Sequence, residues 1–132
     1  MELNYRINSH PHTMDIIDLY TSAGLKRPVD DAERITKMYA NSNLIVSVYH
    51  GDKLVGVARS VTDFCYCCYL SDLAVREEYK KLGIGKRLIE LTKEKLGDEV
   101  TLILLSAPGA MEYYPKVGFD KIENGFIIHR KV

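Results

Sequence analysis

The sequence has no tryptophan, only three cysteines and four prolines among 132 residues, and no formal net charge. An odd number of cysteines gathered in one segment argues against a disulfide framework and for a reducing compartment. No apolar run approaches the roughly 20 residues that a membrane-spanning helix needs. The opening Met-Glu-Leu-Asn-Tyr-Arg also lacks the apolar core of a signal peptide. We therefore expect a single cytoplasmic domain over residues 1–132, with no membrane partner.

The cysteines themselves, Cys65, Cys67 and Cys68, invite a test for a metal site. A structural zinc ion takes about four ligands, usually from two pairs of cysteines or histidines. Here the spacing is Cys-x-Cys-Cys without a second pair, and the four histidines are scattered along the chain. We expect no metal, and interpret the cysteines as small buried side chains of a strand.

The most informative stretch runs over residues 69–90 and predicts a strand, a turn and a helix. Apolar residues at strand spacing lead up to Val75, and apolar residues at helical spacing begin at Ile84. Gly83 and Gly85 remove side chains where the chain must turn sharply into the helix. The first turn of a helix exposes N–H groups without internal partners and carries the positive end of the dipole. This stretch therefore predicts an anion site of the kind that binds phosphates.

Positive charge is concentrated at the same turn. Five basic residues surround it: Arg76, Lys80, Lys81, Lys86 and Arg87. Against Glu77 and Glu78 the local charge is +3, whereas the whole chain is neutral. The alternative is a solvated helix end with ordinary surface lysines. We expect no nucleic-acid partner, because the chain is neutral and no aromatic residues interleave with the basic cluster.

Two common phosphate motifs do not fit the turn. A dinucleotide fingerprint that begins at Gly83 needs its third glycine at position 88, which is Leu88. A P-loop that ends at Lys86 needs serine or threonine next, where Arg87 stands, and places its first glycine on Lys80.

The stretch resembles the acetyl-CoA-binding motif of the GNAT N-acetyltransferase superfamily. That motif is a Gln/Arg-x-x-Gly-x-Gly/Ala turn after a strand that ends in Leu-x-Val. The matching residues here are Leu73, Ala74 and Val75, followed by Lys80, Lys81, Leu82, Gly83, Ile84 and Gly85. The departure is Lys80, which supplies charge but not the planar fork of an arginine.

A second segment, about 30 residues later, resembles the family's Ala-x-x-aromatic-Tyr-x-x-x-Gly-Phe motif. The matches are Ala110, Tyr113, Tyr114, Gly118 and Phe119. The family often has an asparagine that bonds the pantetheine arm where this chain has Ala107. Pro115 should shorten or bend the short helix in this segment.

The resemblance covers nearly the whole chain and implies an α+β (mixed α/β) GNAT fold. This is a mostly antiparallel mixed sheet with flanking helices and a central parallel strand pair that splays apart. The residue patterns predict strands over residues 3–8, 44–49, 54–61, 66–75 and 100–105. They predict one helix from Pro11 to Gly24 and another from an Asp30/Glu33 capping box to about Ala40. After the helix that ends near Gly97, an Asn-Gly turn predicts a closing hairpin of residues 119–122 and 126–129.

The resemblance implies that the protein moves an acetyl group from acetyl-CoA to a primary amine by direct attack. Backbone N–H groups of residues 81–86 would hold the diphosphate, with charge from Lys80, Lys81, Lys86 and Arg87. Backbone groups of Leu73 and Val75 would pair with the pantetheine like an added strand. The Val75 N–H would polarise the thioester carbonyl.

The resemblance also assigns catalytic candidates. Tyr114 matches the motif's general acid toward the leaving thiolate; the alternative is that Tyr113 and Tyr114 are both core aromatics. Asp72 is the best carboxylate near the reactive centre and the candidate base, directly or through water; the alternative is an exposed strand residue. Lys26 and Arg27 lie in a segment that borders the acceptor pocket in the family, and are either contacts for an acidic substrate group or exposed loop cations.

The acceptor is not readable from these residues, although the compact chain favours a small-molecule amine. A different class of function is also open: a catalytically silent acetyl-CoA or CoA-binding module, such as a sensor. A homodimer is an expected assembly by resemblance, often through the closing strands.

Overall fold

A computed structural model describes residues 1–132 and contains one five-stranded mixed sheet. Its strands, in both chain and spatial order, are β1 (Asn4–Ile7), β2 (Leu44–His50), β3 (Lys53–Thr62), β4 (Cys67–Val75) and β5 (Thr101–Leu104). The first three neighbouring pairs are antiparallel, and β4 and β5 are parallel. The expected mixed sheet with one parallel pair is therefore confirmed.

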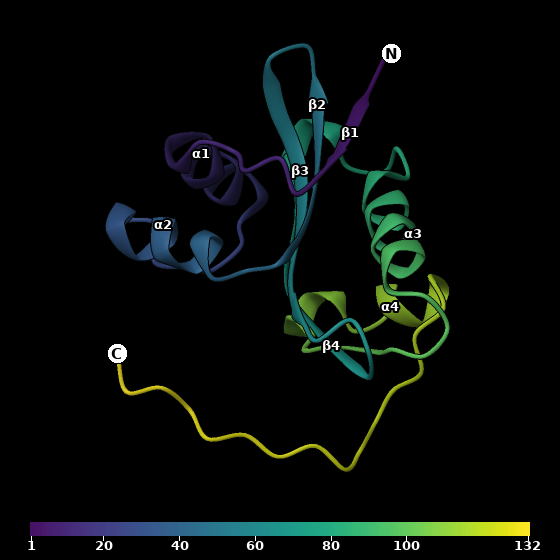
Figure 1. The fold of residues 1–132 in the computed structure, drawn as a ribbon. Helices are drawn as coiled ribbons and strands as arrows, with labels where there is room; N and C mark the ends of the chain where they lie inside the picture. Colours follow the sequence, from purple (N-terminus) through teal and green to yellow (C-terminus); the bar gives the residue numbers. More distant parts are fainter.

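Helices cover both faces of the sheet (Figure 1). Helices α1 (Thr13–Ala23) and α2 (Ala32–Ala40) lie on one face, and α3 (Ile84–Leu96) and α4 (Tyr113–Lys116) lie on the other. Two short 3-10 helices, η1 (Glu77–Tyr79) and η2 (Pro108–Ala110), precede α3 and α4. None of these helices has the length and apolar character needed to cross a bilayer.

Each layer of helices buries its own apolar cluster against the sheet. Ile16, Leu19 and Tyr20 recur at helical spacing and give α1 a fully buried stripe. On the other face, Ile84 and Leu88 of α3 pack on β2, β3 and β4. Because β3 is buried on both faces over most of its length, the sheet centre is rigid and holds the neighbouring β4 in place.

The predicted helix ends agree with the structure to within one or two residues: α1 begins at Thr13 and not at Pro11. Helix α2 is capped by Asp31, whose Oδ1 accepts the N–H of Arg34 at 3.1 Å. The predicted cap at Asp30 is therefore wrong by one position. Pro115 lies within α4, which has only four residues, as the missing proline N–H predicted.

The cysteine interpretation holds for only one of the three residues. Cys68 is buried in β4, whereas Cys65 and Cys67 are exposed. They belong to a turn in which one Asp63 carboxylate oxygen accepts the N–H groups of residues 65, 66 and 67. These bonds lower the pKa of Asp63 to about 2.

The predicted closing hairpin is absent. Residues 120–132 have no regular structure, and every one of them is exposed. Figure 1 shows this segment leaving the body after α4 and ending on the side of α2. Its side-chain hydrogen bond to the body runs from Arg34 Nη2 to the Val132 carbonyl oxygen, at 3.2 Å. Without the hairpin, β5 is the edge of the sheet.

Candidate functional site

The parallel strands β4 and β5 separate partway along and open a pocket. They pair only from Cys67–Leu70 to Thr101–Leu104, and β4 continues unpaired on that side to Val75. A cavity of about 630 Å³ lies beyond the last pair. Its walls include Leu73, Ala74 and Val75 of β4 and, across the gap, residues 104–107 after β5.

The unpaired edge of β4 presents backbone groups to this gap. The Arg76 N–H donates to the Val55 carbonyl of β3 at 2.9 Å. Because successive residues of an antiparallel ladder point in opposite directions, Leu73 and Val75 direct their N–H and C=O groups away from β3. The two residues predicted to pair with an extended ligand therefore have the free edge that such pairing requires.

The turn before α3 is a second set of free donors. The backbone N–H groups of residues 81–86 have no acceptor within the protein, and the first of the following amides to be bonded is that of Arg87, to Gly83. Lys81 and Gly83 adopt left-handed conformations, with φ of 68° and 79°. No acidic side chain lies in the first turn of α3, and no side chain caps it. The turn is thus built to accept an anion.

The cations around the turn differ in availability. Lys80 lines the pocket, although its Nζ also contacts Glu77 Oε2 at 2.9 Å. Arg87 lies 3.6 Å and 3.8 Å from two glutamates on its own helix, Glu94 and Glu90. Arg76 is 6% exposed and binds the Leu54 carbonyl and Asp18. Arg76 therefore links β3 to α1. Its assignment to the basic residues that surround the turn is wrong.

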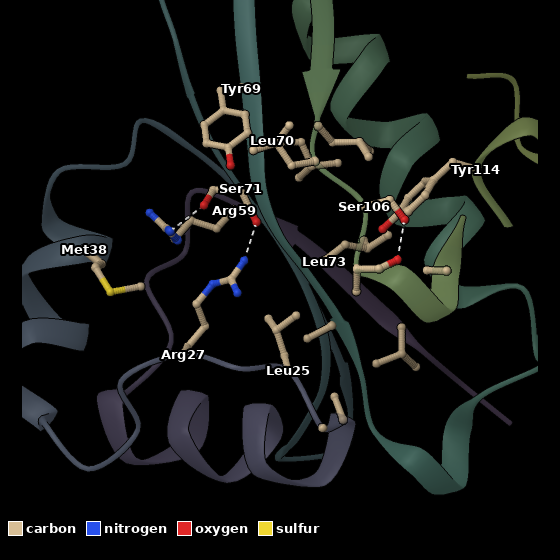
Figure 2. Close-up of a pocket in the computed structure, with 18 of the residues that line it drawn as sticks. Leu25, Arg27, Met38, Arg59, Tyr69, Leu70, Ser71, Leu73, Ser106 and Tyr114 are labelled. Atoms are coloured by element: carbon tan, nitrogen blue, oxygen red, sulfur yellow. Dashed lines mark hydrogen bonds between the residues drawn. The ribbon is translucent and has the colours of Figure 1, made fainter. Parts of the chain in front are cut away.

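Tyr114 lies in the pocket wall, opposite the open edge of β4 (Figure 2). Its ring makes edge contacts with Tyr113 and Phe119, at centroid distances of 5.3 Å and 5.6 Å. Burial, reinforced by the neighbouring Tyr113, raises the pKa of Tyr114. The phenol is consequently protonated at neutral pH and is a hydrogen-bond donor toward the cavity.

Tyr113 faces the anion turn instead. A Cβ at Gly85 would lie 2.8 Å from Tyr113 Oη, so the missing side chain of Gly85 makes room for this ring. Adjacent tyrosines on α4 thus have different surroundings: Tyr114 borders the cavity, and Tyr113 packs over the start of α3.

Asp72 is the centre of a buried polar network between the sheet and α1. Its Oδ1 accepts from Arg27 Nε at 2.6 Å and its Oδ2 accepts from Arg59 Nε at 2.7 Å. Tyr20 Oη also donates to Oδ2 at 2.7 Å, and Ser71 Oγ donates to Oδ1 at 3.1 Å. The side chain of Asp72 has no exposed surface. All of its acceptor capacity is used within the protein.

These contacts do not favour Asp72 as a general base. Burial by itself would raise its pKa, but the hydrogen bond and charge of Arg59, with help from Tyr20 and Arg27, outweigh burial and lower it. A carboxylate that is fully buried, strongly ionised and already paired is a poor proton acceptor. The alternative of an exposed strand residue is also wrong, and Asp72 instead fixes Arg27 and Arg59 at the pocket wall.

Arg59 was missed by the sequence reasoning, although a signal existed. It is an arginine within the otherwise apolar run of β3, directly opposite Asp72 of β4. Opposed charges in the middle of two buried strands indicate an internal ion pair. Arg27 was predicted as either a substrate contact or an exposed loop cation. The structure places it beside Asp72, and its Nη2 also donates to the Ser71 carbonyl at 2.7 Å. Ser71 is the extra residue of a β-bulge in β4, and its side-chain oxygen accepts from Arg59 Nη2 at 3.0 Å.

The pocket lining has one sign of charge. It contains five cationic side chains and no aspartate, glutamate or histidine; the cations are Arg27, Arg34, Arg59, Lys80 and Arg130. Figure 2 shows Arg27 and Arg59 on one side of β4 and Tyr114 with Ser106 on the other. The pocket therefore joins a cationic half and a half formed by the open strand edge.

Comparison of the sequence with known families identifies one domain. Residues 18–128 match the acetyltransferase (GNAT) domain. The chain is 28% identical to the uncharacterized N-acetyltransferase ycf52 of Pyropia yezoensis over 125 residues, which cover 89% of this chain and 70% of that protein.

Solved structures show the same fold. SA2161 from meticillin-resistant Staphylococcus aureus, a protein of unknown function described as a probable acetyltransferase, superposes with a TM-score of 0.84 at 23% identity, covering 98% of this chain and 100% of that one. The aminoglycoside N-acetyltransferase AAC(6')-Iy, solved in complex with CoA, has a TM-score of 0.73 at 14% identity, covering 99% and 96%.

Proposed function

Because the chain belongs to the GNAT acetyltransferase family, we propose that it transfers the acetyl group of acetyl-CoA to the primary amine of a small molecule. One observation carries the proposal: the free N–H groups of residues 81–86 adjoin a cavity bounded by the unpaired edge of β4. A diphosphate and an extended amide-bearing arm need these two sets of partners. A neighbour with the same fold, AAC(6')-Iy, was solved in complex with CoA, which supports the choice of ligand.

Bound acetyl-CoA supplies an activated acetyl group as a thioester, and the chain positions it. The amides of residues 81–86 hold the diphosphate, with Lys80, Lys81 and Lys86 nearby. Leu73 and Val75 bond the pantetheine through their open backbone edge. The Val75 N–H donates to the thioester carbonyl oxygen as negative charge develops there. One such donor contributes about 3 kcal/mol to stabilising a transition state.

Tyr114 stabilises the departing sulfur of CoA. The amine nitrogen bonds to the carbonyl carbon, the carbon–sulfur bond breaks, and the thiolate leaves. A phenol is a weaker acid than a thiol by about 1.5 pKa units in water, and burial raises the pKa of Tyr114 further. Tyr114 therefore acts chiefly as a hydrogen-bond donor to the sulfur. The amine proton leaves through water, because the pocket lining has no carboxylate or imidazole.

The test has two stages. Calorimetric titration with acetyl-CoA and with CoA should show binding at micromolar strength or better. Thiol release is then measured with a panel of small primary amines. Turnover that yields the acetylated amine supports the enzyme. Binding without turnover across the panel overturns the transferase and favours the silent CoA-binding module, whose motivation is Ala107 in the pocket wall where the family often has asparagine.

A further inference from the structure

The cationic half of the pocket has more positive charge than the protein itself neutralises. Arg27 and Arg59 share a single carboxylate, that of Asp72, and both line the cavity. Each guanidinium carries five N–H donors. Three nitrogens of Arg59 each make one hydrogen bond, to Asp72, Ser42 and Ser71, so donors remain on both terminal nitrogens.

Further cations stand at the rim and no acid opposes them. Arg34 of α2 and Arg130 of the C-terminal segment also line the cavity, beside apolar Leu25 and Met38. Arg34 and Arg130 are exposed, whereas Arg59 is buried and Arg27 is partly buried. The surplus charge of the latter two is costly unless a ligand of opposite sign pairs with it. This region lies on the α1–α2 side of β4, away from the diphosphate turn, which has its own donors.

Resting on the proposed function, we infer that the acceptor is an amine that also carries an anionic group, a carboxylate or a phosphate. The anion binds at Arg27 and Arg59, and the amine points toward the thioester at the open edge of β4. Polyamines and other polycationic amines are disfavoured, because their charges meet like charges in the lining. Since arginine forks fit carboxylates and phosphates bidentately, this half of the pocket suits either group.

Matched acceptors test the inference. We expect kcat/KM for β-alanine to exceed that for propylamine at least tenfold, and O-phosphoethanolamine to exceed ethanolamine likewise. Arg27→Gln should raise KM for the anionic amine more than for its neutral partner, and Arg27→Lys should restore part of the difference. Equal or better turnover of the neutral amines or of spermidine overturns the anionic acceptor while leaving the transferase intact. No turnover of any amine overturns both.

Discussion

Arg59 and Asp72 face one another directly across β3 and β4, and the Arg59 Nε donates to Asp72 Oδ2 at 2.7 Å. The carboxylate also binds Arg27, so it links the sheet to the segment between α1 and α2. This contact connects the stability of the fold to the shape of the cationic half of the pocket.

Replacing Asp72 by asparagine should therefore destabilise the protein strongly. The change leaves two guanidinium groups without a buried counter-charge, which typically costs about 3–5 kcal/mol. Urea unfolding followed by circular dichroism measures the free energy of unfolding. Asp18→Asn is the matched control, because the Asp18 carboxylate is 69% exposed beside Arg76 and such pairs contribute under about 1 kcal/mol. Equal effects of the two substitutions would contradict the central role of Asp72.

The same carboxylate should make stability depend on pH in acid. Its pKa is lowered in the folded protein, mainly because Arg59 outweighs burial. A lowered pKa means stability that is present above the unfolded value, about 4, and is lost as pH falls through the folded value. We expect the urea concentration at the unfolding midpoint to decrease as the pH falls below about 4. This decrease should be smaller in Asp72→Asn. An unchanged acid profile in the variant would show that other carboxylates control the transition.

Gly83→Glu should abolish acetyl-CoA binding, because it places a carboxylate at the anion turn. The substitution also strains a left-handed residue with φ of 79°. Gly51→Glu is a control for a glycine of positive φ, since Gly51 lies in the turn between β2 and β3 with φ of 61° and equally open surroundings. Calorimetric titration should show binding by the Gly51 variant and none by the Gly83 variant. Retained affinity in the latter would remove the anion site from the turn.

Tyr114→Phe should lower kcat about 10–100-fold, because a hydrogen bond to a charged group such as the departing thiolate contributes about 1.5–3 kcal/mol, and should leave acetyl-CoA affinity nearly unchanged. The ring contacts with Tyr113 and Phe119 survive the substitution. Tyr113→Phe is the control, because that hydroxyl lies over Gly85 and not toward the cavity centre. Steady-state thiol release separates the two tyrosines. If both variants turn over like the native enzyme, Tyr114 is a core aromatic only.

The pH dependence of kcat/KM should follow the acceptor and not the protein. The lining has no carboxylate or imidazole. The logarithm of kcat/KM should therefore rise with pH at unit slope until the pH reaches the pKa of the amine used. The raised pKa of Tyr114 keeps the phenol protonated beyond its usual value of about 10. Profiles for two amines of different pKa decide the matter. If the profiles of both amines rose with the same apparent pKa near 6–7, a basic group of the protein would be responsible.

Much of the fold could be predicted from the sequence, because it depends on interactions between residues close in the chain. The strands, the helices and the anion turn depend on periodicity and on residues close in the chain, such as Gly83 before Ile84. The Leu-x-Val strand end and the Tyr113–Phe119 segment indicated the family for the same reason. Even the cap of α2 was wrong by only one residue, because Asp30 and Asp31 offer the same carboxylate to a helix start.

The sequence by itself thus determined the family, the order of elements up to the end of β5 and the place of the glycine turn before α3. Only the tertiary structure decided the state of Asp72, which depends on Arg27, Arg59 and Tyr20 arriving from three other segments. It also decided against the closing hairpin, since a local Asn-Gly turn does not form a hairpin unless its strands find an apolar face to cover. Burial and charge pairing are sums over distant residues, and a linear pattern does not contain them.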